Sequence, residues 1–332
     1  MLITRLDRAT ARAAIAVANR APSLHNSQPW RWRIGDASLH LFADPQRALP
    51  ATDPTGRDLR ISCGAALHHL RVALRASGLD AHVHRFPDPA APRHLAAVEP
   101  FTRRPTDDDL ALAAAVERRR SDRRMFSTWP VDPGLLDELR QAAEHESAEL
   151  RLLEQDDQRF AVARLVERAA VEQAFVADLA QETAAWTGRS RVAADGVPAT
   201  VVPADPRGLV PVRRFAGAEL GQVELGRGES DGTVLALLAT AEDDPVDQLR
   251  AGEALSAVLL TATRIGLATD PISQPLEVPD TRAELRSLCL DGALEPHLVL
   301  RLGWAPMSAA PLPATGRRAV DDTIDDLARP WR

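Results

Sequence analysis

The chain has 332 residues, a formal net charge of −7 and 45% hydrophobic residues, which gives it enough length and apolar content to bury a sizeable core. The acidic balance argues against a nucleic-acid or acidic-membrane partner, so any site for an anion has to be local. The sequence has no lysine, which excludes covalent lysine chemistry and leaves arginine to bind phosphate groups.

The two cysteines, Cys63 and Cys289, show neither the spacing of a disulfide framework nor that of a C-x-x-C metal site. No apolar run approaches the roughly 20 residues that span a bilayer, and no secretory segment stands at the N-terminus. We therefore expect a cytoplasmic protein without a membrane anchor.

Helices and strands of ordinary length alternate along the chain and include hairpin signals, which favours an α+β fold. Predicted helices cover 6–20, 55–77, 110–119, 134–144, 159–183, 245–264, 280–290 and 320–327. Predicted strands cover 30–34, 38–43, 81–86, 95–101, 150–153, 233–240, 268–272 and 297–302. A dinucleotide-binding Rossmann fold has no support, because no G-x-G-x-x-G follows a strand.

The acidic helix start at Asp107–Asp109 marks the predicted boundary between an N-terminal half, 1–108, and a C-terminal half, 109–332. Residues 186–232 are rich in Gly, Pro, Arg and Asp and have no sustained period. A loop of this length is either a lid over a site or a variable surface insertion, and both readings stay open.

Two stretches carry candidate binding residues. The first is Pro22-Ser23-Leu24-His25-Asn26-Ser27-Gln28-Pro29-Trp30, a connector between a helix and a strand. Its small residues let a backbone approach a flat ligand, and its amides can bind the ligand's polar rim. The second places five arginines around Ser121 between residues 118 and 124, which suits a phosphate. Ordinary turn chemistry and a solvated helix end are the alternatives.

The first stretch, P-S-x-x-N-x-Q-P-W, resembles the flavin segment of the FMN-dependent nitroreductase family, and its histidine resembles the Acg-like branch. The second resembles the family's R-R-S-x-R-x-F motif, which holds the FMN phosphate and ribityl chain. One extra residue before Phe126 leaves either Arg123 or Arg124 as the second arginine of that motif.

Two further segments resemble the family. Gly266–Gln274 is similar to G-L-x-x-x-P-I-x-x, which faces the flavin N5, although Ser273 and Gln274 replace the usual acidic residue and glycine. Arg317 and Arg318 resemble a basic pair that reaches the phosphate. The resemblance thus implies an FMN site formed by Pro22, Ser23, His25, Asn26, Gln28, Arg119, Arg120, Ser121, Arg123, Arg124, Ser273, Gln274, Arg317 and Arg318.

In the family, one subunit carries both flavin motifs and two subunits pair. Here the first half has P-S-L-H-N but only Arg5-Leu6-Asp7-Arg8 upstream, and the second half has the arginine motif but no P-S-x-x-N. Because the losses are complementary, we expect two fused nitroreductase-like halves that form an intrachain pseudo-dimer with one complete FMN site. The chain is then a monomer or a homodimer of pseudo-dimers.

The resemblance implies hydride transfer from NAD(P)H, through FMN, to a small nitroaromatic or quinone-like acceptor. The cofactor supplies the difficult chemistry, so no catalytic protein residue is expected. The alternatives are a flavin-sequestering protein with a lidded site and little turnover, and a pseudo-dimer that has lost flavin. His68 and His69 are neighbours on a predicted helix and point apart, so they do not form a predicted metal site. His82 and His84 share one face of a predicted strand, but no third ligand lies near them in the sequence.

Overall fold

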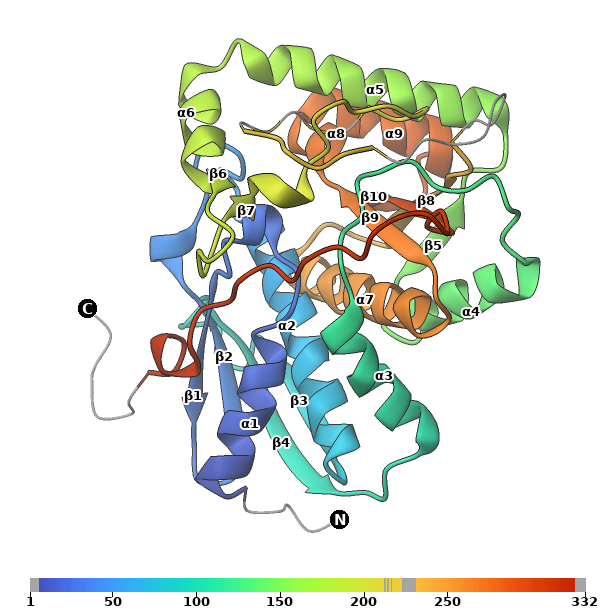
Figure 1. The fold of residues 1–332 in the computed structure, drawn as a ribbon. Coiled ribbons are helices and arrows are strands. Elements are labelled where there is room, and N and C mark those ends of the chain that lie inside the picture. Colours follow the sequence, from blue (N-terminus) through green and yellow to red (C-terminus); the bar gives the residue numbers. More distant parts are fainter. Residues whose placement is uncertain (1–5, 212, 214, 216, 223–230, 326–332) are drawn as a thin grey trace.

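Two four-stranded antiparallel sheets, separated by a pair of long helices, make up the framework of the protein (Figure 1). The computed structural model describes residues 6–211, 213, 215, 217–222 and 231–325. The first sheet has the order β1-β2-β4-β3 and comprises β1 (Trp30–Ile34), β2 (Leu39–Ala43), β3 (Leu79–Arg85) and β4 (His94–Thr102). The second has the order β5-β8-β10-β9 and comprises β5 (Glu149–Leu152), β8 (Val234–Thr240), β9 (Ala268–Ile272) and β10 (Glu295–Gly303).

The two sheets repeat one topology. Each half runs through two strands, a long helix and two further strands, and in each the last strand pairs between the second and the third. The long helices are α2 (Arg57–Ala76) and α7 (Pro245–Arg264). The repeat confirms the predicted α+β pseudo-dimer of two fused halves.

The remaining helices surround this framework. They are α1 (Arg8–Ala18), α3 (Asp107–Arg118), α4 (Pro133–Glu144), α5 (Asp156–Ala174), α6 (Ala177–Trp186), α8 (Gln274–Glu277) and α9 (Pro279–Leu290). Most of them follow from the sequence pattern and its caps: Thr106 and Asp109 form a capping box at α3, and Asp244 caps α7.

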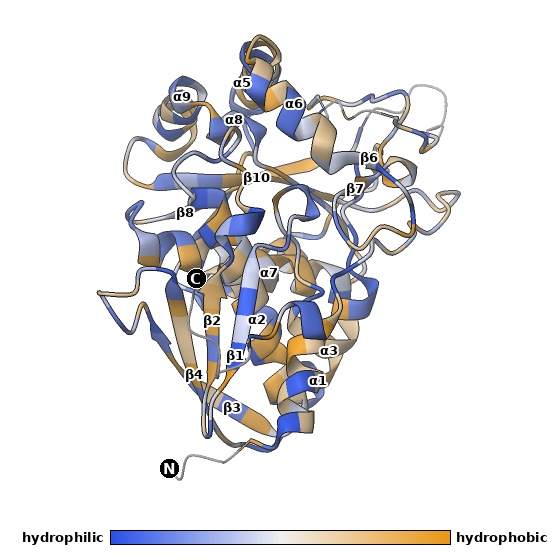
Figure 2. Cartoon of the chain, turned by 90° about the vertical axis from the view of Figure 1, so that its left-hand side faces the viewer, coloured by the Kyte–Doolittle hydropathy of each residue, from blue (hydrophilic) through white to orange (hydrophobic). Residues whose placement is uncertain are grey.

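The halves meet where α2 crosses α7. A Cβ on Gly252 of α7 would lie 1.9 Å from the carbonyl oxygen of Ile61 on α2, so only glycine permits this approach. Each half also has its own core. Trp30 and Trp32 of β1 are fully buried under α1 and α2, whereas the second sheet has apolar clusters on both faces, one with α4 and α7 and one with α5 and α9 (Figure 2).

The end of the described chain returns from the second half to the first. After β10 it crosses the molecule and lies beside β1, where the Trp32 N–H donates to the Thr323 carbonyl at 2.7 Å and the Asp325 N–H donates to the Trp32 carbonyl at 2.8 Å (Figure 1). The predicted helix 320–327 is therefore wrong. A single 3₁₀ turn, Val320–Asp322, precedes this contact, because the open edge of β1 offers backbone groups that need partners, and residues 326–327 lie outside the described residues.

One other predicted helix needs correction, and one helix was missed. The single helix 159–183 is two helices, α5 and α6, which are separated at Phe175 and Val176. No glycine or proline marks this break in the sequence. The short helix α8 was not predicted, because four residues are too few for a period to emerge.

Residues 186–222, as far as they are described, form a connector with a two-stranded parallel pair, β6 (Thr187–Arg189) and β7 (Val197–Pro198), and a 3₁₀ turn, Ala199–Val201. Positions 212, 214, 216 and 223–230 of the predicted lid lie outside the described residues. Within the part of the chain that the structure describes, no helix combines the length and apolar character of a membrane span.

Candidate functional site

The connector between α1 and β1 has an unusual backbone. His25, Asn26 and Gln28 all have positive φ angles, of 49°, 54° and 52°. Non-glycine residues in this region cost about 1–3 kcal/mol each, and such strain is concentrated at binding sites. The Ser23 hydroxyl stabilises the turn by accepting the Gln28 N–H at 2.9 Å, and Ser62 of α2 accepts the Leu24 N–H at 3.2 Å.

The amides of this connector bind two parts of the chain that are distant in sequence, residues 194–196 and residues 316–318. The Asn26 side chain donates to the carbonyls of Gly196 at 3.1 Å and Gly316 at 3.2 Å. The Gln28 side chain donates to the Ala194 carbonyl at 2.8 Å and accepts the Arg318 N–H at 2.8 Å. The Oδ1 atom of Asn26 is buried without a hydrogen-bond partner among the described residues.

The arginine segment is fixed to the edge of β9. The Asp122 N–H donates to the Thr269 carbonyl at 2.8 Å, and Ser121 forms an isolated bridge with Thr269. Asp122 also binds the neighbouring Arg124 guanidinium at 2.8 Å, which turns Arg124 away from the connector and leaves Arg123 facing it. This placement favours Arg123 as the second arginine of the motif.

One cavity brings the predicted segments together between the two halves. It encloses about 1240 Å³, including space open to solvent. Its walls contain most of the predicted site residues: Pro22, Ser23, His25, Asn26, Arg119, Arg120, Ser121, Arg123, Ser273, Gln274 and Arg317. Three predicted residues lie behind the wall instead, because Gln28 binds Ala194, Arg124 binds Asp122 and the Arg318 guanidinium binds the carbonyls of Gln28 and Trp30.

One end of the cavity is cationic. Arg119, Arg120 and Arg317 converge there, beside Ser121. Arg119 is 6% exposed, and its Nε and Nη1 atoms have no hydrogen-bond partner among the described residues. Burial, together with Arg120 and Arg20, lowers the pKa of Arg119 to about 10, and burial with Arg119 lowers the pKa of Arg317 to about 9. Buried cations that repel one another are stabilised by an anion, so this end suits a phosphate group.

A second group of cavity residues is built around His25. The guanidinium of Arg213 donates to its Nε2 atom at 3.1 Å, so the ring is neutral and carries its proton on Nδ1. Burial, then Arg213 and Arg123, holds the pKa of His25 well below its ordinary value. Phe215 packs edge-on against His25 at 6.0 Å between ring centroids, and the Arg123 guanidinium lies 5.3 Å from the Phe215 centroid.

Several cavity residues were missed by the sequence reasoning. Asp58 at the start of α2, Arg213 and Phe215 in the 186–222 segment, and Asp270 on β9 all line the cavity. Asp58 and Asp270 are buried, and burial raises the pKa of both carboxyl groups. Asp58 belongs to no local motif, and Asp270 stands at a variable position of the Gly266–Gln274 segment, so only the fold reveals them as cavity residues.

Ser273 and Gln274, which replace the acidic residue and the glycine of the resembling segment, are held in place by hydrogen bonds. The Ser273 hydroxyl donates to Glu277 at 2.7 Å, and the Gln274 side-chain amide donates to Gln173 at 2.9 Å. The Oε1 atom of Gln274 is buried without a partner among the described residues. The fold and the site thus define a protein of two fused halves. The cavity between the halves suits a flat ligand, and its arginine-rich part suits a phosphate group.

Comparison with known proteins agrees with this class. No protein-family model matches the chain. A Mycobacterium tuberculosis (strain H37Rv) protein named "Putative NAD(P)H nitroreductase Rv3131" is 43% identical over 96% of this chain and 92% of its own length. Another from the same strain, "Putative NAD(P)H nitroreductase acg", is 34% identical over 97% of each chain. The chain therefore belongs to the NAD(P)H nitroreductase family of oxidoreductases, in the branch that includes acg.

Solved structures give weaker likenesses. The crystal structure of the FMN and NADPH-dependent nitroreductase NfnB, from a Sphigopyxis strain, matches 66% of this chain and 99% of its own at 17% identity and a TM-score of 0.41. A nitroreductase with bound FMN from Bacteroides fragilis matches 60% of this chain and 90% of its own at 14% identity and a TM-score of 0.38.

Proposed function

We propose that the chain binds one FMN in the cavity between its halves and transfers hydride from NAD(P)H to a small nitroaromatic or quinone-like acceptor. One observation carries the proposal. The Pro22–Asn26 connector of one half and the Arg119–Ser121 segment of the other both line a single cavity.

The donor set fits FMN. The Nε and Nη1 atoms of the buried Arg119 have no partner among the described residues, and with Arg120, Arg317 and Ser121 they offer donors to the phosphate. Asn26 Oδ1 and Gln274 Oε1 are buried acceptors to which no described residue donates, so either can accept from the N–H group of an oxidised flavin ring. When bound, the flavin supplies the hydride chemistry, and these side chains orient it and exclude water.

We propose the division of the chain at 108/109 as the boundary between the halves. It falls within the first turn of α3, which begins at Asp107.

A second candidate function is flavin sequestration with little turnover. It is favoured by the hydrogen bonds from Asn26 and Gln28 to Gly196 and Ala194, which keep the 186–222 segment over the connector as a lid. We place the protein in the cytoplasm, where NAD(P)H is available and where the free thiols Cys63 and Cys289 stay reduced.

The absorbance spectrum of the purified protein, before and after anaerobic NADPH, tests these proposals. Flavin bands at one per chain that bleach with NADPH support the oxidoreductase. Bands that remain oxidised support sequestration. A ratio of two flavins per chain contradicts the single shared site, and no bands after FMN is added contradict flavin binding.

A further inference from the structure

Asp58 is an acidic side chain in the cavity wall that no motif explains. It stands in the first turn of α2, in the half that contributes the Pro22–Asn26 connector. It is 5% exposed and faces the cavity with Ile61 and Ser62. A carboxyl group in such a position needs a reason, because burying it is costly.

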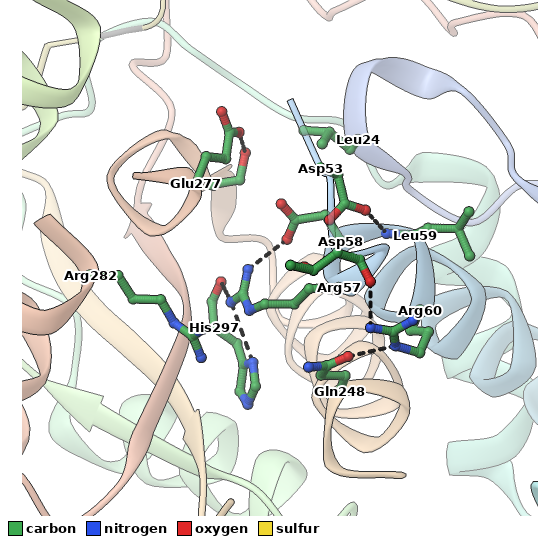
Figure 3. A network of polar contacts seen from close by, with 12 residues as sticks. Leu24, Asp53, Arg57, Asp58, Leu59, Arg60, Gln248, Glu277, Arg282 and His297 are labelled. Carbon is green, nitrogen blue, oxygen red and sulfur yellow. Dashed lines mark hydrogen bonds and ion pairs between the residues drawn. The ribbon is translucent and has the colours of Figure 1, made fainter. Parts of the chain in front are cut away.

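The hydrogen bonds of Asp58 leave part of the group available. Its Oδ1 atom accepts from the Arg57 guanidinium at 2.8 Å, and no described residue donates to its other oxygen. Figure 3 shows that second oxygen turned away from Arg57, on the side where Leu24 and Glu277 lie. Arg57 is itself shared, since it also donates to the carbonyls of Pro296 and His297.

Burial, more than the surrounding charges, favours the protonated form of Asp58. Burial raises its pKa to about 7, and the carboxylates of Asp53 and Glu277 add to this, while Arg57 and Arg213 oppose it. Arg213 is in turn committed to an ion pair with Glu277. Arg57 is also 3.8 Å from Asp243, so its charge is divided between two carboxylates.

The other buried titratable groups of the cavity are held by arginine. Asp270 accepts from Arg301 at 3.3 Å, and Arg123 and Arg301 both favour its carboxylate form. His25 accepts from Arg213 through Nε2 and has a pKa too low to hold a second proton near neutral pH. Asp58 combines, in one cavity-lining group, an oxygen to which no described residue donates and a pKa raised to about 7.

We propose that the Asp58 carboxyl group donates a proton to the acceptor that is reduced in the cavity. The proposal rests on the proposed function. For a quinone the balance is quinone + NAD(P)H + H⁺ → hydroquinone + NAD(P)⁺. NAD(P)H supplies both electrons as hydride, Asp58 supplies one proton to a quinone oxygen, and the resulting carboxylate is reprotonated from water.

Two measurements test the proposal. The first is pH-difference infrared spectroscopy of wild-type protein without added NAD(P)H or acceptor, and of the Asp58→Asn and Asp36→Asn variants. Asp36 is an exposed residue in the β1–β2 turn and serves as the matched control. We expect a protonated-carboxyl band that disappears with a midpoint near pH 7 in wild type and Asp36→Asn and is absent from Asp58→Asn.

The second measurement is the rate of reduction of a soluble benzoquinone by FMN-loaded protein between pH 5 and 9. We expect the wild-type rate to fall above the infrared midpoint. Asp58→Asn should be slower by about 100-fold at pH 6, the scale of general acid catalysis, with a flat pH profile and unchanged FMN affinity. The loss should shrink towards pH 9, where the wild-type group is ionised.

The outcomes distinguish a failure of this proposal from a failure of the proposed function. If the wild type binds no FMN, the proposed function fails, while the infrared band still reports whether Asp58 is protonated. If FMN and NADPH react normally but Asp58→Asn keeps the wild-type pH profile, Asp58 is not the donor. Should that variant not fold, wild-type infrared and rate midpoints that differ by more than one pH unit contradict the proposal.

Discussion

Gly64 on α2 and Gly252 on α7 touch backbone to backbone: a Cβ on Gly252 would lie 2.8 Å from the Cα of Gly64, and a Cβ on Gly64 would lie 2.0 Å from the Leu249 carbonyl oxygen. This contact sets the distance between the halves, and therefore the width of the cavity between them.

Gly252→Ala should push the two helices apart and lower the free energy of unfolding by about 1–3 kcal/mol, the usual cost of overpacking. FMN affinity should fall with it, because the opposing walls separate. Urea denaturation and FMN titration measure the two effects. Gly221→Ala is the control, since nothing lies within 4 Å of its added Cβ. Wild-type stability in Gly252→Ala would show that the helices adapt without cost.

Replacing Arg119 should weaken FMN binding and stabilise the FMN-free protein. Arg119→Met removes a buried cation that has no carboxylate partner among the described residues, so FMN affinity should drop by roughly 10- to 150-fold, the value of one charged hydrogen bond. The same change should raise the melting temperature of the FMN-free protein, because an unpaired buried charge is lost. The exposed neighbour Arg118, changed to Met, should alter neither quantity. Unchanged FMN affinity in Arg119→Met would place the phosphate elsewhere.

The contacts of the 186–222 segment should control how fast flavin leaves. Asp195 binds Arg47 at 2.6 Å across to the first half. Asp195→Ala should therefore speed FMN release and expose residues 190–196 to limited proteolysis. Asp205 forms an exposed local pair with Arg207 in the same segment, so Asp205→Ala is a matched control. Equal release rates in both variants would mean that the segment does not gate the cavity.

Buried neutral histidines should make the protein sensitive to acid. Burial, then Arg71 and Arg75, holds the pKa of His68 well below 6.5. Below pH 6.5 the unfolded chain gains a proton there that the folded chain does not, so stability falls as pH decreases. His68→Gln should reduce the slope of unfolding free energy against pH by about 1.4 kcal/mol per pH unit between roughly pH 5 and 6. His84, exposed on β3, gives the control variant His84→Gln, with a wild-type slope.

Much of the fold followed from sequence pattern, and the exceptions have physical causes. Strands such as β1 and β9 match their predicted bounds because alternation or turn residues define them. The prediction of one helix over 159–183 was wrong at Phe175. No residue there opposes helix formation, so only packing separates α5 from α6. The predicted helix from Val320 was wrong because pairing with β1, which is distant in sequence, overrides local propensity.

The candidate site was predictable where residues form continuous motifs. The connector and the arginine segment both reach the cavity. The motif alone could not distinguish Arg123 from Arg124. The structure distinguishes them, because Arg124 pairs with Asp122 while Arg123 lines the cavity. Asp58 could not be found in this way. In the sequence, an aspartate in a first helical turn is an ordinary partner of the helix dipole, and only its burial beside Asp53 and Glu277 makes it distinctive.

The return of the chain from β10 to β1 joins the halves a second time, in addition to the covalent link between β4 and α3. In a pair of separate subunits, a site made at their interface is lost when the protein is diluted below the dissociation constant of the pair. Here the two halves belong to one chain, so the effective concentration of one half relative to the other is fixed. Occupancy of the cavity should then depend on the concentration of its ligand and not on that of the protein.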